Sequence, residues 1–514
     1  MKLSEHNTSS WVVTTLADVI GWRNSLIRLH ARLASYFARP QPYERMLRFL
    51  QAVLSQVERK NGWQVAEQAR EATPYGMQRL LSGAVWDEDG VRDEVRAFAL
   101  EHLGTTQAII AIDETSFPKR GDHSAGVKKQ YCGTTGRLQN CQVGVFLSYI
   151  TALGHTLIDR ELYPPQDWTD DRARCRQAGI PDTLGFRTKP DLAIQMLERL
   201  HQAQVPLNWV VADSVYGGHV ELRTWLESHQ YPYVGAVACD EPVVLVVPDG
   251  GVRRMEVRDG AARVLTDADW HRLAMSEGSK GPRLFDWACV PLLHRGGDDG
   301  WHSLLIRRTI EATPQLAYYL VFAPPQTPLQ AKVCALGGRW RIEDDFENGK
   351  DLGLDHYEVR SFVGWYRHIT LVMLALAFLV SICVQDRALT APPADVGTPA
   401  HTGGTPTCSG SLEHGESDKH KSHAPAHQAG EQAFPREKEP AHESHSPPAD
   451  LWPLSVPEVR HLLAHLLFPP PSSVKLVLAW SAWRRWHQRL ASFFHIQRRL
   501  KAGSRRRASS ASFS

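Results

Sequence analysis

Two aspartates occupy positions where a carboxylate could carry out chemistry. Asp113 ends the apolar run AIIAI, and Asp213 ends WVVA, so each lies at the polar end of a stretch typical of a buried strand. A carboxylate there is costly to bury unless it is paired or binds a cation. Because strand ends converge at one edge of an α/β sheet, we expect the two side chains to meet. The alternative for either residue alone is an ordinary loop cap.

A third candidate lies in the charged stretch RWRIEDDFENGK, which begins at Arg339. On a helix with about 100° per residue, Glu343 shares one narrow stripe with Arg339 and Lys350, while Asp344 and Asp345 point in other directions. Helical phase therefore selects Glu343 for chemistry and leaves its acidic neighbours as surface charge. The alternative is an ordinary surface helix with an ion pair between Arg339 and Glu343, four residues apart.

Three carboxylates in the order Asp, Asp, Glu, carried by two strands and a helix, would form a site for two divalent cations. Hard oxygen ligands suit Mg²⁺, which keeps several waters and accepts phosphate oxygens. Two such ions can activate a nucleophile and stabilise the leaving oxygen in an in-line phosphoryl displacement. Arg339 and Lys350 would then hold phosphates of the substrate.

The pattern of the chain supplies elements that could position these residues. Residues 1–105 repeat apolar positions at three-to-four spacing and are predicted to form a helical unit. From 106 to 240, the order strand, strand, strand, helix, strand predicts an α/β core with a mixed sheet. Residues 241–314 contain short strands between Gly and Asp turns, which indicates a β-rich insertion, and residues 315–385 return to the core with the Glu343 helix.

The last part of the chain has a different composition. Residues 386–450 are rich in Pro, Gly, Ser, His and Glu, and this predicts a disordered linker whose histidines could bind a metal weakly. Residues 451–514 regain helical periodicity. From Lys475 onward there are ten Lys or Arg residues and no Asp or Glu, beside several tryptophans, which suits a polyanion. A solvated helix with a frayed basic end is the alternative.

The totals limit the class of protein. A chain of 514 residues is too long for one ordinary core, and a net charge of +2 says little about partners. Eight scattered cysteines without a C-x-x-C pair argue against a disulfide framework or zinc ribbon and favour a reducing compartment. The N-terminus lacks the apolar core of a signal peptide, and the apolar run at 369–384 matches a buried helix better than a membrane span. We therefore expect a soluble cytoplasmic protein without membrane association.

With these residues in view, the sequence resembles the DDE transposases of bacterial insertion sequences, which have a ribonuclease-H-like catalytic core. It is most similar to the branch whose last carboxylate lies in a Tyr-x₂-Arg-x₃-Glu-x₆-Lys signature. Arg339, Glu343 and Lys350 stand at the matching spacing, whereas Leu336 stands at the tyrosine position. The segments AIDETSFPKRG and VADSVYGG resemble the surroundings of the first two carboxylates in that branch.

The resemblance covers roughly residues 40–385 and, more loosely, the final sixty residues. It implies a ribonuclease-H-like mixed sheet flanked by helices, with a β-rich insertion and helical terminal units. It implies Asp113, Asp213 and Glu343 as catalytic metal ligands, Arg339 and Lys350 as DNA contacts, and Mg²⁺ as cofactor, with Mn²⁺ able to substitute. The implied activity is DNA cleavage at the element ends followed by strand transfer, that is, cut-and-paste transposition. The implied partners are double-stranded DNA, both terminal inverted repeats and target, and a second copy in a homodimer; the implied location is bacterial, cytoplasmic and DNA-associated.

Three questions stay open at this point. In a related branch an aromatic side chain holds a flipped base during a hairpin step; Trp270, Trp287 and Trp301 are candidates here, and a packed core tryptophan is the alternative for each. A ribonuclease-H-like endonuclease without strand transfer and a catalytically inactive DNA-binding relative are the other possible functions. We expect the N-terminal unit to read the element ends and the C-terminal unit to contact the DNA backbone or a dimer partner.

Overall fold

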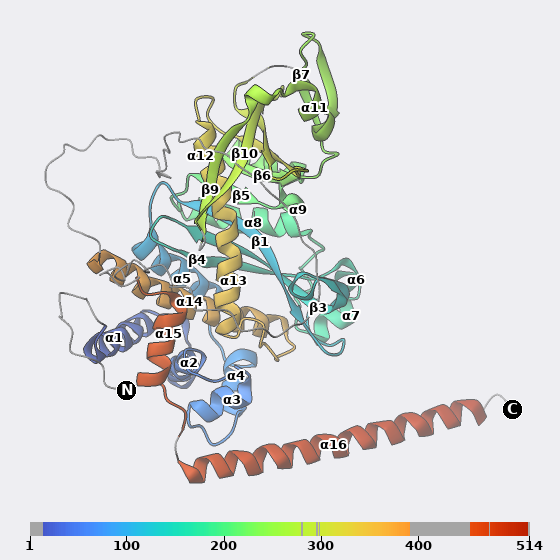
Figure 1. The fold of residues 1–514 in the computed structure, drawn as a ribbon. Coiled ribbons are helices and arrows are strands. Elements are labelled where there is room, and N and C mark those ends of the chain that lie inside the picture. The colour runs from blue at the N-terminus through green and yellow to red at the C-terminus, as the bar shows by residue number, and fades with distance from the viewer. Residues whose placement is uncertain are drawn as a thin grey trace, which may run out of the picture.

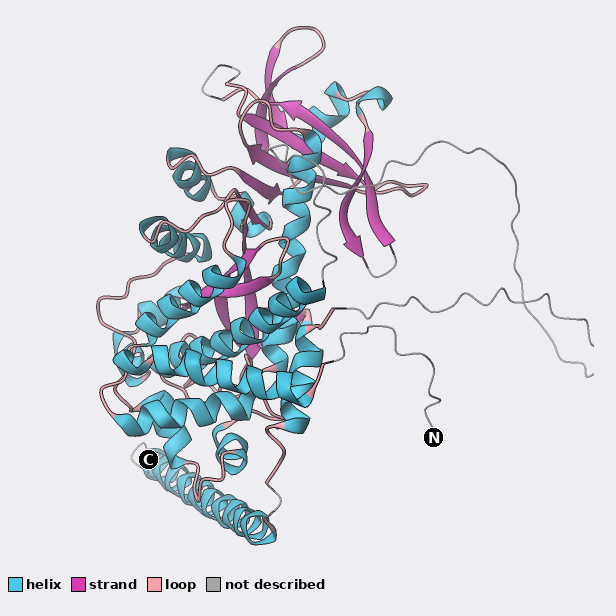
Figure 2. Cartoon of the chain, turned by 90° about the vertical axis from the view of Figure 1, so that its left-hand side faces the viewer, coloured by secondary structure: helices cyan, strands magenta, loops and turns pink. Residues whose placement is uncertain are grey.

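The computed structural model describes residues 14–511 except 279–280, 295–296, 298, 391–452 and 472. The predicted linker therefore lies outside the described residues from position 391 onward. Helices gather at one end of the molecule, a large sheet runs through its middle, and a strand-rich part forms the opposite end (Figures 1 and 2).

The central sheet has the strand order of a ribonuclease-H-like core. Along one part of it the order is β4-β3-β1-β5-β6, in which β3 is antiparallel to both β1 and β4, while β5 and β6 run parallel to β1. The predicted mixed α/β sheet flanked by helices is thus confirmed. The strands are β1 (Ile109–Pro118), β2 (Lys128–Cys132), β3 (Arg137–Ile150), β4 (His155–Tyr163), β5 (Trp209–Ala212) and β6 (Tyr233–Val237).

The sequence explains the central position of β5 and the hairpin of β3 and β4. All four residues of WVVA in β5 are buried, as expected for a parallel strand covered on both faces. The TALG segment turns the chain between β3 and β4, with the amide of Thr151 donating to the carbonyl of Gly154 at 2.9 Å.

The sheet does not stop at β6. Strand β12 pairs with β6 in antiparallel orientation, and β11, β10 and β9 follow in order, so strands from the predicted insertion extend the core sheet itself. A separate two-stranded sheet, β7 with β8, carries α11. The bounds are β7 (Pro242–Val246), β8 (Val252–Glu256), α11 (Val257–Val264), β9 (His271–Gly278), β10 (Gly281–Pro291), β11 (His302–Arg308) and β12 (Leu316–Phe322).

Five helices form the N-terminal unit, and polar caps set several of their starts. Thr15 forms a capping box with Asp18, and the side chains of Asn61 and Asp87 accept from the first-turn amides of α3 and α5. The helices are α1 (Leu16–Arg32), α2 (Pro40–Val53), α3 (Gly62–Gln68), α4 (Tyr75–Ser82) and α5 (Glu88–Leu103).

The apolar run at 369–384 lies within the long helix α14 (Phe362–Thr390). This helix is long and apolar enough to cross a membrane, but 89% of its most apolar window is buried inside the protein. It packs on α5, α2, α4 and β4, between the helical unit and the sheet. Burial in the core therefore accounts for its apolar character.

The C-terminal part consists of α15 (Val456–Leu466) and the long α16 (Val474–Ala511), which extends away from the body (Figure 1). The start of α16 is anchored to the N-terminal unit: Trp480 is buried and donates from Nε1 to the carbonyl of Glu71 at 3.0 Å, and Trp483 packs edge-on against Trp63. The basic helix is thus attached to the body through its aromatic first turns.

The other helices connect the strands and cover the sheet. They are α6 (Gln166–Thr169), α7 (Arg172–Gln177), α8 (Lys189–Gln202), α9 (Ser214–Gly217), α10 (Val220–Ser228), α12 (Leu329–Gly337) and α13 (Arg341–Asp351). A short 3₁₀ turn, Gly338–Trp340, joins α12 to α13.

Candidate active site

Asp113 and Asp213 lie at neighbouring positions on adjacent parallel strands. Ile112 of β1 is paired with Ala212, the last residue of β5, so the two aspartates that follow face the same edge of the sheet. Asp213 caps α9, its Oδ1 accepting from the amide of Val215 at 2.9 Å. The predicted meeting of the two aspartates follows from this register.

Burial and neighbouring negative charge raise the pKa of both aspartates. The side chain of Asp113 is 17% exposed. Burial, and then the neighbouring charge of Asp213, raise the pKa of Asp113 to about 7. Burial, and then the charge of Glu114, also raise the pKa of Asp213. Two acidic groups are thus held together at a cost that a bound cation would relieve.

Two glycines bring the next element close to β1. A Cβ on Gly337 would collide with the carbonyl oxygen of Met275 in β9, and one on Gly338 would lie 2.9 Å from Cδ1 of Ile109 in β1. The absence of side chains at these two positions allows the turn between α12 and α13 to pack directly on the sheet. Arg339, the next residue, is thereby placed beside Asp113.

Arg339 is shared between two of the three predicted carboxylates. Its Nη1 lies 3.7 Å from Oδ2 of Asp113, and its Nη2 lies 3.2 Å from Oε1 of Glu343, four residues further along. The guanidinium also lies over the ring of Trp340, 4.5 Å from its centroid. The structure thus brings Asp113, Asp213, Arg339 and Glu343 into one group.

Lys350 lies apart from this group. It is seven residues beyond Glu343, or about 10 Å along the helix axis. Together with Lys60, His356 and Arg460 it lines a separate open hollow of about 780 Å³ between the N- and C-terminal units. If Lys350 contacts DNA, it does so at a different phosphate from any that Arg339 reaches.

The acidic neighbours of Glu343 have two different environments. Asp344 is half-exposed and pairs with Arg341 at 3.3 Å, as expected for surface charge. Asp345 is fully buried, and the interpretation of this residue as surface charge is wrong. Its Oδ2 accepts from Ser148 Oγ at 2.5 Å, and its Oδ1 lies 2.8 Å from Nδ1 of His155. The face of α13 away from Glu343 packs on β3 and β4, and Asp345 is the polar anchor of that contact.

Sequence reasoning missed a fourth acidic residue beside the site, Glu114. Its Oε1 pairs with Nζ of Lys189 at 2.5 Å, and its Oε2 accepts from the hydroxyl of Tyr216 at 2.6 Å. Strand alternation turns Glu114 to the opposite face of β1 from Asp113, where it connects β1 to α8 and α9. Its position directly after Asp113, and that of Tyr216 three residues after Asp213, were the available signals.

The remaining sequence candidates are packed side chains. Leu336, at the signature's tyrosine position, is fully buried in α12, and Trp287 is fully buried in β10. Trp301 stacks on Phe322 with ring centroids 4.9 Å apart, while the guanidinium of Arg308 covers the ring of Trp270 at 4.2 Å. Trp287 is therefore a core tryptophan, as the alternative interpretation states.

The chemistry of the aspartate pair suits a hard divalent cation. All candidate ligands are carboxylate oxygens, and burial together with the charge of Asp213 raises the pKa of Asp113 even though Arg339 lies nearby. Asp113 and Asp213 would hold the cation, and Glu343, which is 51% exposed and paired with Arg339, lies at the rim of the same group. Among the described residues, one group has three possible ligand atoms within 4.8 Å of one another, and it is a different one from the carboxylate site. It consists of Glu227, His294 and His302.

The sequence matches two related family models. Residues 32–281, which contain Asp113 and Asp213, match the DDE superfamily endonuclease model. Residues 185–378, which contain Asp213 and Glu343, match the transposase DDE domain model. The two matches overlap and between them cover the whole candidate site.

Comparison with known proteins gives a consistent result. The chain is 30% identical over 165 residues to the probable transposase for insertion sequence element IS701 of Microchaete diplosiphon, covering 32% of this chain and 40% of that relative. A piggyBac transposase in a synaptic complex with hairpin DNA matches 74% of this chain and 68% of its own, at 11% identity and a TM-score of 0.30, which is too low to support a statement on fold or function. Over residues 32–378 the chain is thus similar to DDE endonucleases and transposases.

Proposed function

We propose that this protein is a transposase that cleaves DNA at the ends of an insertion element and joins the freed ends to target DNA. The observation that carries the proposal is the convergence of Asp113, Asp213 and the Arg339–Glu343 pair at one sheet edge, inside the region that matches DDE endonucleases and transposases. The similarity of part of the chain to the probable transposase of IS701 supports the proposal.

The proposed site contains groups for two tasks, holding a cation and holding a phosphate. Asp113 and Asp213 would hold Mg²⁺, with Glu343 as the third ligand and Mn²⁺ as a possible replacement. When bound, such ions activate the attacking oxygen and stabilise the leaving one. Arg339 is the group proposed to hold a phosphate, because its guanidinium lies beside Asp113 and Glu343. A guanidinium can bind a phosphate through two parallel hydrogen bonds.

We propose that DNA contacts extend beyond this site to both ends of the molecule. The hollow that contains Lys350 also includes Lys60, Arg460 and three histidines, together with the carboxylates of Glu58, Asp351 and Glu458, so its lining is mixed in charge. We propose Lys350 for a contact with the phosphate backbone there. Helix α16 continues for many residues beyond its anchor and carries most of the basic residues of the C-terminal region. We propose the N-terminal helices for reading the terminal inverted repeats, and α16 for backbone contacts or for a homodimer in the DNA complex.

Cleavage by variants at Asp213 tests the proposal. Because Asn caps a helix about as well as Asp, Asp213→Asn removes the charge but keeps the start of α9. We expect the parent protein to nick, in Mg²⁺, a DNA that carries the inverted repeats flanking this gene, and Asp213→Asn to lose this activity while still binding the DNA. Asp344→Asn, at a half-exposed position on the same helix as Glu343, is the matched control. Undiminished nicking by Asp213→Asn would show that the site is wrongly assigned.

A second assay separates the alternatives. Precleaved element ends are incubated with the protein and a supercoiled plasmid, and integration products are counted. Cleavage without integration indicates an endonuclease that does not transfer strands. Binding to inverted repeats without metal-dependent nicking indicates a DNA-binding relative without catalysis, a possibility raised by the buried Leu336 at the signature's tyrosine position.

A further inference from the structure

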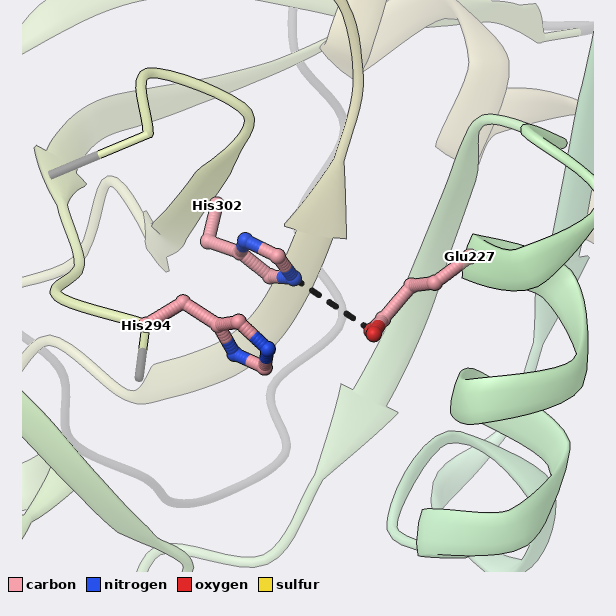
Figure 3. Close-up of side chains that lie close together, drawn as sticks. All are labelled: Glu227, His294 and His302. Carbon is pink, nitrogen blue, oxygen red and sulfur yellow. Dashed lines mark ion pairs between the residues drawn. The ribbon is translucent and has the colours of Figure 1, made fainter. Parts of the chain in front are cut away.

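A second group of metal-ligating side chains lies outside the carboxylate site (Figure 3). Glu227 lies in α10, His294 lies in the connection between β10 and β11, and His302 is the first residue of β11. One ligand atom from each of the three residues lies within 4.8 Å of the other two. The group therefore joins a helix of the catalytic core to the strands that extend the sheet.

The contacts around His302 leave one ring nitrogen directed at Glu227. Nδ1 of His302 lies 2.8 Å from Oδ2 of Asp299, and a carboxylate only accepts, so Nδ1 carries a proton. Nε2 is buried and lies 3.3 Å from Oε1 of Glu227, a contact that is an ion pair when the ring carries both protons (Figure 3). In the neutral ring the lone pair of Nε2 faces this carboxylate, and a divalent cation between the two atoms would take the place of the proton that the ion pair requires.

The outer contacts of the group are those of a metal site. Asp299 is itself fixed, since its Oδ1 accepts from the amides of Trp301 and His302 at 2.9 and 3.2 Å. Oε1 of Glu227 accepts from the hydroxyl of Tyr233 at 2.8 Å. A carboxylate behind a ligating histidine fixes the ring and its tautomer, and a hydrogen-bonded carboxylate ligand is the usual companion.

The rings of His294 and His302 are stacked, with centroids 4.1 Å apart and planes 10° from parallel. Both can bind one ion once the rings tilt out of this stack. Two imidazoles and one carboxylate, with a fourth position open to water, form a donor set typical of Zn²⁺ and unlike the all-oxygen set at Asp113. We propose that Glu227, His294 and His302 bind a zinc-type divalent transition-metal ion that ties α10 to the start of β11 and to His294, which precedes that strand.

Metal titration of the full-length protein tests this site. The protein is stripped with a chelator, excess Mg²⁺ is added to occupy oxygen-only sites, and Zn²⁺ binding is measured by calorimetry and Co²⁺ binding by visible absorption. Other histidines, between positions 401 and 445, contribute equally to every variant. We expect His302→Gln and Glu227→Gln to bind one ion fewer per chain than the parent, with a loss of the matching Co²⁺ absorption. His271→Gln, at an exposed position in β9, is the control and should bind as the parent does.

A milder variant keeps the test valid if the ligand variants fold poorly. Asp299→Asn retains a side-chain oxygen but removes the charge behind His302, and we expect it to weaken binding at this site by about 10- to 100-fold without changing the number of ions bound. Equal affinity and equal stoichiometry in the parent, Asp299→Asn and His302→Gln would overturn the proposal. So would a parent that binds no Zn²⁺ under these conditions, because Nε2 of His302 would then hold a proton in a simple ion pair with Glu227.

Discussion

Removing the charge of Asp113 should stabilise the protein in the absence of metal while abolishing its activity. Burial and the charge of Asp213 raise the pKa of Asp113 from its ordinary value of 3.8 to about 7. At about 1.4 kcal/mol per pKa unit, ionised Asp113 costs roughly 4 kcal/mol of folding free energy at about pH 8. Asp113→Asn keeps the shape of the side chain and removes the charge, so the variant should recover a large part of this cost.

The pH dependence gives the sign of the effect. Between pH 3.8 and about 7 the folded state binds more protons at Asp113 than the unfolded state does. The parent therefore loses stability as pH rises through this window, and the cost is complete above it. The advantage of Asp113→Asn should be small near pH 4, grow by roughly 3 kcal/mol between about pH 5 and 8, and then level off.

The assay is thermal unfolding of the parent and Asp113→Asn in a chelator across this pH range. For domains of a few hundred residues, each 1 kcal/mol shifts the melting temperature by about 2 to 4 °C, so the expected gain at high pH is easily measured. Mg²⁺ should then stabilise the parent and not the variant, because only the parent retains the carboxylate pair. Asp344→Asn should change neither curve. If Asp113→Asn is no more stable than the parent at any pH, the two carboxyls are not crowded as described and the reasoning fails.

Three further outcomes follow from the surroundings of α13 and α14. Glu343→Gln should abolish metal-dependent nicking, whereas Asp344→Asn should largely retain it in the same gel assay; equal loss in both would mean that the helix presents another face to the substrate. Asp345→Ala leaves the buried hydroxyl of Ser148 without its acceptor, so we expect the free energy of unfolding, measured by chemical denaturation, to fall by about 2 to 4 kcal/mol. Unchanged stability would contradict the anchoring role of Asp345. Burial lowers the pKa of His368 to about 4, so below about pH 6.5 the unfolded state binds more protons than the folded state, and stability should be lost as pH falls to about 4. The melting temperature of a His368→Gln variant should therefore depend less on pH over that window. An equal slope in parent and variant would exclude this histidine as the cause.

The sequence predicted those parts of the site that depend on local pattern. Apolar runs ending in Asp113 and Asp213 were sufficient to place both residues at one sheet edge, since parallel strands bring such ends together. Helical phase separated Glu343 from Asp344. It could not show that Asp345 would be buried, because phase gives the direction of a side chain but not what packs against that face.

Long-range contacts were beyond the reach of the same reasoning. The pairing of β12 with β6, and hence the joining of the predicted insertion to the core sheet, depends on register between segments far apart in the sequence. The group formed by Glu227, His294 and His302 depends on that same pairing, and the spacing of these residues along the chain gives no sign of it. Likewise, the contact of Arg339 with Asp113 requires the close packing permitted by two glycines.

The unbroken sheet from β1 to β9 has a mechanical consequence. Between β6 and β12 there are five aligned residue pairs, and between β12 and β11 there are seven, with no hinge between them. A force applied to the strand-rich end is therefore carried through these backbone ladders to β5, which Asp213 directly follows. The strand-rich end and the edge that carries Asp213 are therefore mechanically coupled through one continuous sheet.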